Sequence, residues 1–174
     1  KVDYVDAPTF EGVRLSYKSS GGRAFVTELY LPKKMSSLSS LTIRASGGGL
    51  DKLNWEKGTG TLELPRFKLE GKTDLKPLLS KLGMGVAFTD AANFSKLSLQ
   101  PTKVSGVLQK AVLEVNEEGA KAAAVTGVLI QTTSLALPPK AFNLVLNRPF
   151  FMTIREKTTN IPLFLGAIYN PDSR

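Results

Sequence analysis

The side chains best suited to chemistry are two adjacent carboxylates, Glu117 and Glu118, a residue type that serves as general acid and base. The chain contains no histidine and no cysteine. A Ser-His-Asp or Cys-His catalytic site, or a zinc site of the usual Cys/His type, therefore cannot be built from this chain alone. Without a histidine or a third acid nearby in sequence, the pair favours a structural role. We expect neither an enzyme nor a bound cofactor or metal.

The segment after the acidic pair consists of small residues. Between Gly119 and Ala124 there is no β-branched or aromatic side chain, and Lys121 is the only long one. Side chains of a strand alternate between its two faces, so Ala120, Ala122 and Ala124 would share one face and Lys121 would stay solvated on the other. A strand-like run precedes this segment and a long uncharged stretch follows it. The pattern predicts a small-residue hinge whose backbone can be extended and still enter a narrow gap.

This hinge resembles that of the serpins, the serine protease inhibitor family, and the resemblance continues from about residue 24 to residue 174. Residues 1–23 fit more loosely. Further segments resemble signatures of the family in matching order and spacing: Leu64–Leu69, Asp74–Met84, Ala87–Phe88, Asn93–Ser98, Asn147–Phe151, Leu163–Gly166 and Asn170–Pro171. A complete serpin is considerably longer. The resemblance thus implies that residues 1–174 are the C-terminal part of a single serpin domain, with the N-terminal half absent from this chain.

The resemblance implies an α+β, predominantly β fold, with parts of the main sheet A plus sheets B and C and few short helices. Alternation and turn signals predict the elements independently. We expect one or two short helices within residues 36–53 and a helix from residue 74 to 82 that ends at Gly83. Strands are expected at residues 13–17, 24–31, 59–69, 104–115, 142–146, 150–155 and 163–169, with a hairpin turn at Ser19–Gly22 between the first two.

The resemblance also implies a mechanism. A target protease cuts a reactive-centre loop at about residues 117–141 and forms an acyl-enzyme, and the freed hinge inserts into the main sheet. The hinge consists of Glu117, Glu118, Gly119, Ala120, Lys121, Ala122, Ala123 and Ala124. The alternative is a non-inhibitory serpin that acts as a ligand carrier or chaperone-like binding protein. Small residues on the inward face of the hinge favour the inhibitor.

Family spacing places the cleaved bond at Thr133–Ser134, where a small threonine would suit an elastase-like protease. If the register differs, Leu135–Ala136 would suit a chymotrypsin-like enzyme. Lys140–Ala141 would suit a trypsin-like enzyme but lies too far along the loop.

Two supporting positions follow from the resemblance. Glu117 would lie at the top of a central strand and pair with Arg66 on the neighbouring strand, holding the sheet closed where the loop enters. Gln109 occupies a position in a sheet-opening cluster where many serpins have histidine. Glutamine can both donate and accept hydrogen bonds, but it lacks the pH sensitivity of histidine.

Composition limits the partners. The charge of +8 comes from 23 basic and 15 acidic residues, but the lysines and arginines are dispersed, which is typical of a solvated surface. We therefore expect no nucleic acid partner. The basic charge is compatible with polyanion binding, but nothing in the pattern supports it. No apolar run approaches transmembrane length, so no membrane partner is expected. Asn93-Phe94-Ser95 matches a glycosylation acceptor motif that is common by chance. The compartment is not fixed by the sequence, although the resemblance favours an extracellular one.

Overall fold

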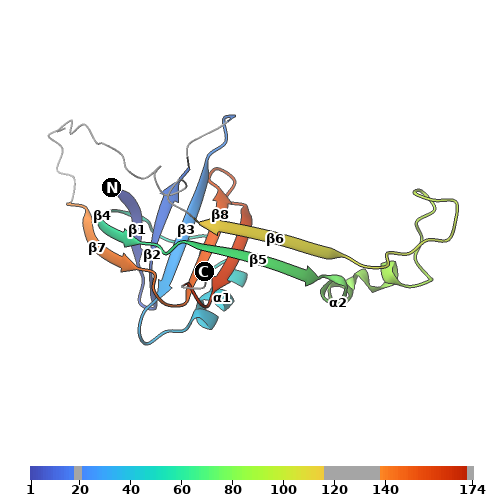
Figure 1. Ribbon diagram of the computed structural model, residues 1–174. Coiled ribbons are helices and arrows are strands. Elements are labelled where there is room, and N and C mark those ends of the chain that lie inside the picture. Colours follow the sequence, from blue (N-terminus) through green and yellow to red (C-terminus); the bar gives the residue numbers. More distant parts are fainter. Residues whose placement is uncertain (18–20, 116–137, 172–174) are drawn as a thin grey trace. The chain divides into compact units, whose positions relative to one another are not determined.

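The computed structural model describes residues 1–17, 21–115 and 138–171, which form two compact units. The larger unit contains residues 1–67 and 115–174, and the smaller one contains residues 68–114. Each unit has its own sheet (Figure 1).

The larger unit is built on a seven-stranded sheet in the order β7-β4-β1-β2-β3-β8-β9 (Figure 1). Its strands are β1 (Val2–Asp6), β2 (Phe10–Ser16), β3 (Phe25–Pro32), β4 (Glu56–Glu63), β7 (Lys140–Val145), β8 (Phe150–Glu156) and β9 (Pro162–Ile168). All neighbours in this sheet are antiparallel except β4 and β7, which are parallel. The hairpin predicted between β2 and β3 is confirmed by their pairing, and Gly21 and Gly22 have the positive φ angles that a turn favours.

One face of this sheet is covered by α1 (Leu38–Ser46). The helix begins where the Ser37 hydroxyl accepts a hydrogen bond from Ser40 N at 3.2 Å. Its buried residues Leu38 and Leu41 join a core cluster that includes Tyr30. The other members of that cluster are Val5, Phe10, Leu50 and Phe151. The aromatic and apolar residues of β3 thus place this strand at the centre of the core.

The smaller unit is a two-stranded ribbon of β5 (Phe67–Asp74) and β6 (Leu108–Val115), whose arrows point in opposite directions (Figure 1). Between them lie α2 (Lys76–Leu79), the π-helical turn η1 (Ser80–Met84) and the 3₁₀ turn η2 (Gly85–Phe88). Leu75 N donates to Val107 O at 2.8 Å and closes the ribbon at this end. The described residues contain no helix that is long and apolar enough to cross a membrane.

The prediction of a mostly β fold with few short helices is confirmed. The single long strand expected at residues 59–69 is wrong, because it is divided into β4 and β5, which belong to different sheets. Pro65 lies at the break, where it has no N–H to donate to a ladder. The helix expected from residue 74 to 82 is also shorter, since Asp74 still belongs to β5 and the α-helical part ends at Leu79. The strand expected at residues 104–115 begins only at Leu108.

Candidate functional site

The predicted hinge and both predicted cleavage bonds lie outside the described residues. This applies to every hinge residue from Glu117 to Ala124 and to the bonds Thr133–Ser134 and Leu135–Ala136. The structure does describe the two strands to which this segment is attached. β6 ends at Val115, two residues before the first hinge residue Glu117, and β7 begins at Lys140.

The proximal attachment is β6. Among the described residues, β6 has one strand neighbour, β5, so its other edge has no strand beside it there. Backbone N–H and C=O groups at such an edge can pair with an added strand. Leu108 and Val112, on one face of β6, are 63% and 57% exposed. Gln109 is also exposed on this strand, and the cluster predicted for it stays a prediction.

The distal attachment is held by charge. Lys140 Nζ donates to Asp6 Oδ2 at 3.0 Å, and Lys33 Nζ donates to Asp6 Oδ1 at 2.6 Å. The hydrogen bond from Lys33, followed by that from Lys140, holds the pKa of Asp6 below its ordinary value. Lys140 Nζ also lies 5.8 Å from the ring centroid of Tyr4. The first residue of β7 is therefore tied to the end of β1.

Aromatic packing continues this attachment along β7. The rings of Phe142 and Tyr4 are stacked, with centroids 5.0 Å apart and planes 11° apart. Two glycines of β4 make room for Phe142. A Cβ at Gly60 would lie 1.8 Å from Phe142 O, and one at Gly58 would lie 3.0 Å from Phe142 Cδ1. Only residues without a side chain fit here, so the parallel register of β4 and β7 depends on these glycines.

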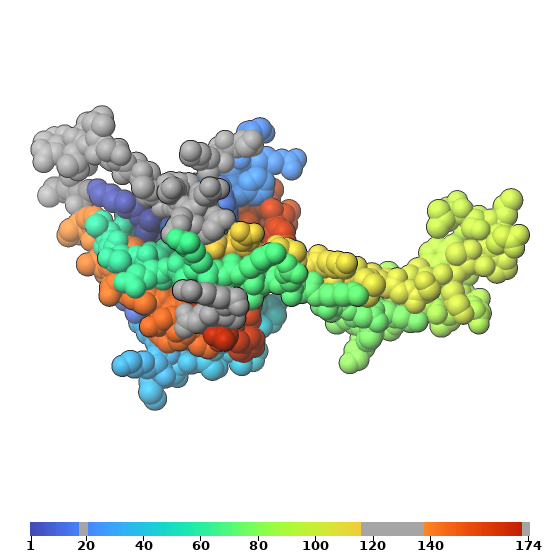
Figure 2. Space-filling model, viewed as in Figure 1, coloured from blue at the N-terminus to red at the C-terminus, as the bar shows by residue number. Residues whose placement is uncertain are grey.

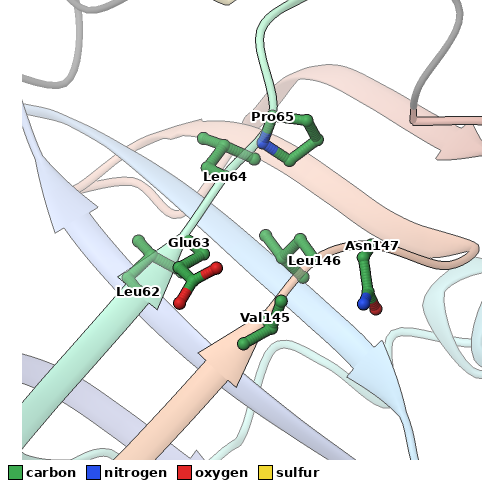
Figure 3. Close-up of a pocket in the computed structure, with 7 residues that line it drawn as sticks. All are labelled: Leu62, Glu63, Leu64, Pro65, Val145, Leu146 and Asn147. Carbon is green, nitrogen blue, oxygen red and sulfur yellow. The ribbon is translucent and has the colours of Figure 1, made fainter.

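Arg66 lies in the segment between β4 and β5, and its side chain is exposed. Its predicted partner, Glu117, is outside the described residues, so this pair stays a prediction. Beside this segment is a pocket of about 420 Å³, at the ends of β4 and β7 (Figure 3). It is lined by Leu62, Glu63, Leu64, Pro65, Val145, Leu146 and Asn147. Its lining contains one carboxylate and no second titratable group, which gives it no acid–base pair.

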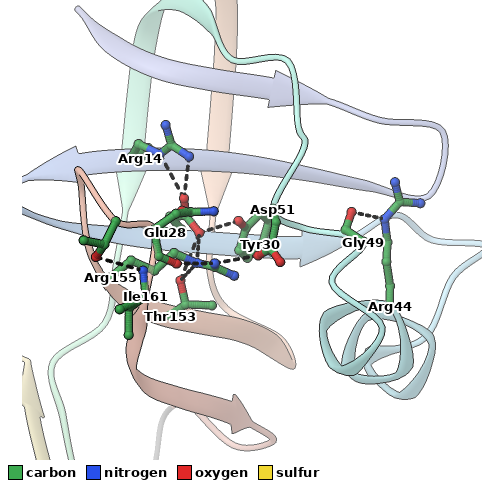
Figure 4. A network of polar contacts seen from close by, with 11 residues as sticks. Arg14, Glu28, Tyr30, Arg44, Gly49, Asp51, Thr153, Arg155 and Ile161 are labelled. Atoms are coloured by element: carbon green, nitrogen blue, oxygen red, sulfur yellow. Dashed lines mark hydrogen bonds and ion pairs between the residues drawn. The ribbon is translucent and has the colours of Figure 1, made fainter.

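Sequence reasoning missed a buried polar network on the α1-covered face of the sheet, centred on Glu28 of β3 (Figure 4). Glu28 is 0% exposed. Arg14 donates to its Oε1 from Nε at 2.9 Å and from Nη2 at 2.6 Å. Tyr30 and Thr153 donate to Oε2 at 2.6 Å and 3.0 Å, and Arg155 Nε lies 3.0 Å from the same oxygen.

The network extends to the turn after α1, because Arg155 Nη1 donates to Asp51 Oδ1 at 2.6 Å. Arg14 also stacks on Trp55, with its guanidinium carbon 4.3 Å from the ring centroid. Burial, assisted by nearby Glu28, raises the pKa of the Tyr30 phenol. In the described part of the chain no buried side-chain polar atom lacks a partner. Every buried polar group of the network therefore has a partner, which indicates a structural role. The one sequence signal for it is an acidic residue, Glu28, in the middle of an apolar strand.

The described ranges contain no group of three or more His, Cys, Asp or Glu residues that could hold a metal ion. The described residues on either side of the predicted loop thus form two attachments, β6 before it and β7 after it.

Comparison with known proteins identifies relatives of one family along nearly the whole chain. The family model described as serpin (serine protease inhibitor) matches residues 1–171. Iripin-8 of Ixodes ricinus is 39% identical over 152 residues, which cover 84% of this chain and 38% of Iripin-8. Serpin-Z1A of Triticum aestivum is 33% identical over 168 residues, which cover 91% of this chain and 42% of that protein. The chain thus spans about two fifths of the length of these curated relatives.

Solved structures agree. The native stressed conformation of AtSerpin1 from Arabidopsis is 28% identical with a TM-score of 0.73, and the match covers 97% of this chain and 45% of that one. Thyroxine-binding globulin in complex with thyroxine has the same TM-score of 0.73 at 24% identity, which shows a shared fold alone.

Proposed function

Because this chain belongs to the serpin family of serine protease inhibitors, we propose that the whole protein inhibits a serine protease as a suicide substrate. The protease cuts the loop between β6 and β7, and the hinge that follows β6 inserts into a sheet before the acyl-enzyme is hydrolysed. The target is an elastase-like or chymotrypsin-like protease.

One observation carries this proposal: β6 leads directly into the small-residue hinge, and one of its edges has no strand neighbour in the described residues. A hinge that folds back beside β6 would supply N–H and C=O partners to that edge. Insertion would lower the free energy through new backbone hydrogen bonds and burial, and one cut in the loop would allow it to occur. A strand already paired along both of its edges would leave no site for an inserted strand.

The length of the connection also supports the proposal. Residues 116–139 join β6 to β7. Connections longer than roughly 12–15 residues are uncommon, and they are usually either functional loops or linkers. At about 3.3 Å per residue an extended chain of this length can present a central bond to a protease and still reach back to β6.

The distal attachment complements the hinge. Asp6 and Tyr4 hold the start of β7 to β1 through Lys140 and Phe142. After cleavage, the C-terminal side of the loop would stay bound to the seven-stranded sheet while the hinge side moves. We place the cleaved bond at Thr133–Ser134, with Leu135–Ala136 as the alternative.

The experiment compares two identical substitutions on neighbouring residues of the hinge in the full-length protein. Ala122→Arg puts a charge on the inward face, where burial without a partner would cost on the order of several kcal/mol. Ala123→Arg puts the same charge on the outward face, where water solvates it. The measured quantity is the moles of inhibitor consumed per mole of protease inhibited, together with SDS-stable complex on a gel.

We expect Ala122→Arg to be cut as fast as the wild type but to form little complex, because slow insertion lets the acyl-enzyme hydrolyse. Ala123→Arg and Lys121→Glu should behave like the wild type. Equal stoichiometry for the two arginine variants would refute the alternation and the insertion mechanism. A wild-type protein that is cut without forming complex would favour the rival function, a non-inhibitory ligand carrier or chaperone-like protein.

A further inference from the structure

We propose that Asn93 is an N-glycosylation acceptor, so that the protein carries an N-linked glycan on the loop between η2 and β6. Asn93-Phe94-Ser95 is the one place in the chain where an asparagine precedes Ser or Thr by two residues without an intervening proline. The sequence motif alone is weak. The structure adds the exposure, the local conformation and the position of this asparagine.

The Asn93 side chain is exposed and its two polar atoms differ in their contacts. Oδ1 accepts a hydrogen bond from Ser95 N at 3.1 Å, which makes an Asx turn. In the described part of the chain no acceptor engages Nδ2. The carboxamide is therefore fixed through its oxygen, while the nitrogen that would bear the sugar has no hydrogen-bond partner among the described residues. Ser95, which supplies the hydroxyl of the motif, is exposed as well.

The loop that carries Asn93 is ordered by its own hydrogen bonds. Leu97 N and Ser98 N both donate to Phe94 O, at 2.8 Å and 3.0 Å, and Lys103 pairs with Asp90 at 2.6 Å. In the space-filling view the atoms of this loop form one end of the smaller unit (Figure 2). A glycan would thus be attached at a defined point on an accessible turn.

The same loop exposes two large apolar side chains, Leu97 at 81% and Leu99 at 102%. Exposed leucines close together are a liability for solubility. A bulky, hydrated glycan on Asn93 would cover this part of the loop. This gives the modification a physical role that does not depend on protease inhibition.

The modification transfers a sugar to Asn93 from a lipid-linked oligosaccharide, which is the second substrate. Asn93 Nδ2 forms a bond to the anomeric carbon of the sugar, and the bond from that carbon to the pyrophosphate oxygen of the lipid carrier breaks. The electron pair of the broken bond leaves with the pyrophosphate, which takes up the proton lost from Nδ2.

The position of Asn93 also separates this modification from the proposed inhibition. The loop precedes β6, whereas the hinge follows it. The eight residues of β6 span about 25 Å at 3.3 Å per residue. We therefore expect the glycan to leave hinge insertion unaffected.

The test expresses the full-length protein through the secretory pathway of an insect cell line and maps the Asn93 peptide by mass spectrometry. We expect this peptide to appear only after treatment with peptide N-glycosidase, with Asn93 converted to Asp. Asn93→Gln, Ser95→Ala and Asn93→Asp should abolish the modification, and Asn93→Asp retains an oxygen for the Asx turn. Ser95→Thr and the matched loop variant Ser98→Ala should retain it.

Secreted wild-type protein with an unmodified Asn93 peptide would overturn the proposal, as would a glycan that persists in Ser95→Ala. The readout is the mass of one peptide. It is therefore independent of whether the protein inhibits a protease, and the two proposals can fail separately.

Discussion

Removing the charge of Glu28 should destabilise the protein far more than removing any exposed charge. Glu28→Gln keeps the shape of the side chain but leaves one carboxamide oxygen where two carboxylate oxygens served Arg14, Tyr30, Thr153 and Arg155. Whichever way the amide is oriented, its NH₂ group faces a guanidinium, that of Arg14 or that of Arg155, which cannot accept a hydrogen bond and has lost this acceptor.

The magnitude follows from burial. The side chain of Glu28 is 1% exposed and that of Arg155 is 4% exposed, and breaking a buried pair by removing one partner costs about 3–5 kcal/mol. Asp51 still neutralises Arg155 in part, and Arg14 is 21% exposed and stacked on Trp55. We therefore expect Glu28→Gln to lower the free energy of unfolding by about 3 kcal/mol, the lower end of this range. That is a large share of a typical stability of about 5–15 kcal/mol.

The assay is equilibrium unfolding of the full-length protein in guanidinium chloride, with the midpoint and the slope of the transition measured separately. The matched control is Lys57→Met, which breaks a salt bridge to Asp3 of 2.5 Å in which Lys57 is 72% exposed. This pair should contribute at most about 1 kcal/mol. If Glu28→Gln and Lys57→Met shift the midpoint equally, burial does not determine the energetics of this network.

Four further results are expected. Gly60→Ala should detach β7 from β4, because its Cβ would lie 1.8 Å from a backbone oxygen, whereas Gly71→Ala has open space and serves as the control; hydrogen exchange of the β7 amides measures this. Asp6→Asn should lower stability at pH 7, and because the pKa of Asp6 is lowered in the fold, the difference from wild type should be present above pH about 4 and vanish as the pH falls through the folded-state pKa. Hydrogen bonds from Thr159 lower the pKa of Glu156 to about 2, so Thr159→Val should raise it in an NMR titration; an unchanged midpoint would contradict this cause. Residues 1–174 expressed alone should not unfold cooperatively in a thermal melt, since their exposed apolar strand residues would face water. A soluble monomer with a sharp thermal transition would contradict this prediction.

The sequence by itself determined the elements that depend on local pattern. Apolar runs predicted β3, β8 and β9 to within a few residues, and the glycines after β2 predicted the hairpin. Period-two alternation and turn residues act over a few neighbouring positions, so they are readable without knowing the partners. The small-residue hinge and the family signatures are also local patterns in the sequence. The proposed function continues to depend on them.

Tertiary structure decided which strands pair and which charges meet. No local signal places β7 beside β4 in parallel, because their register depends on the fit of Phe142 over two glycines far away in sequence. Pro65 is a local signal for a break in the expected strand, but only the fold shows that β4 and β5 pair in different sheets. Glu28 is stable in the core only because Arg14 and Arg155 reach it from neighbouring strands. A buried charge is tolerated when its partners arrive from distant residues, and the fold alone brings those residues together.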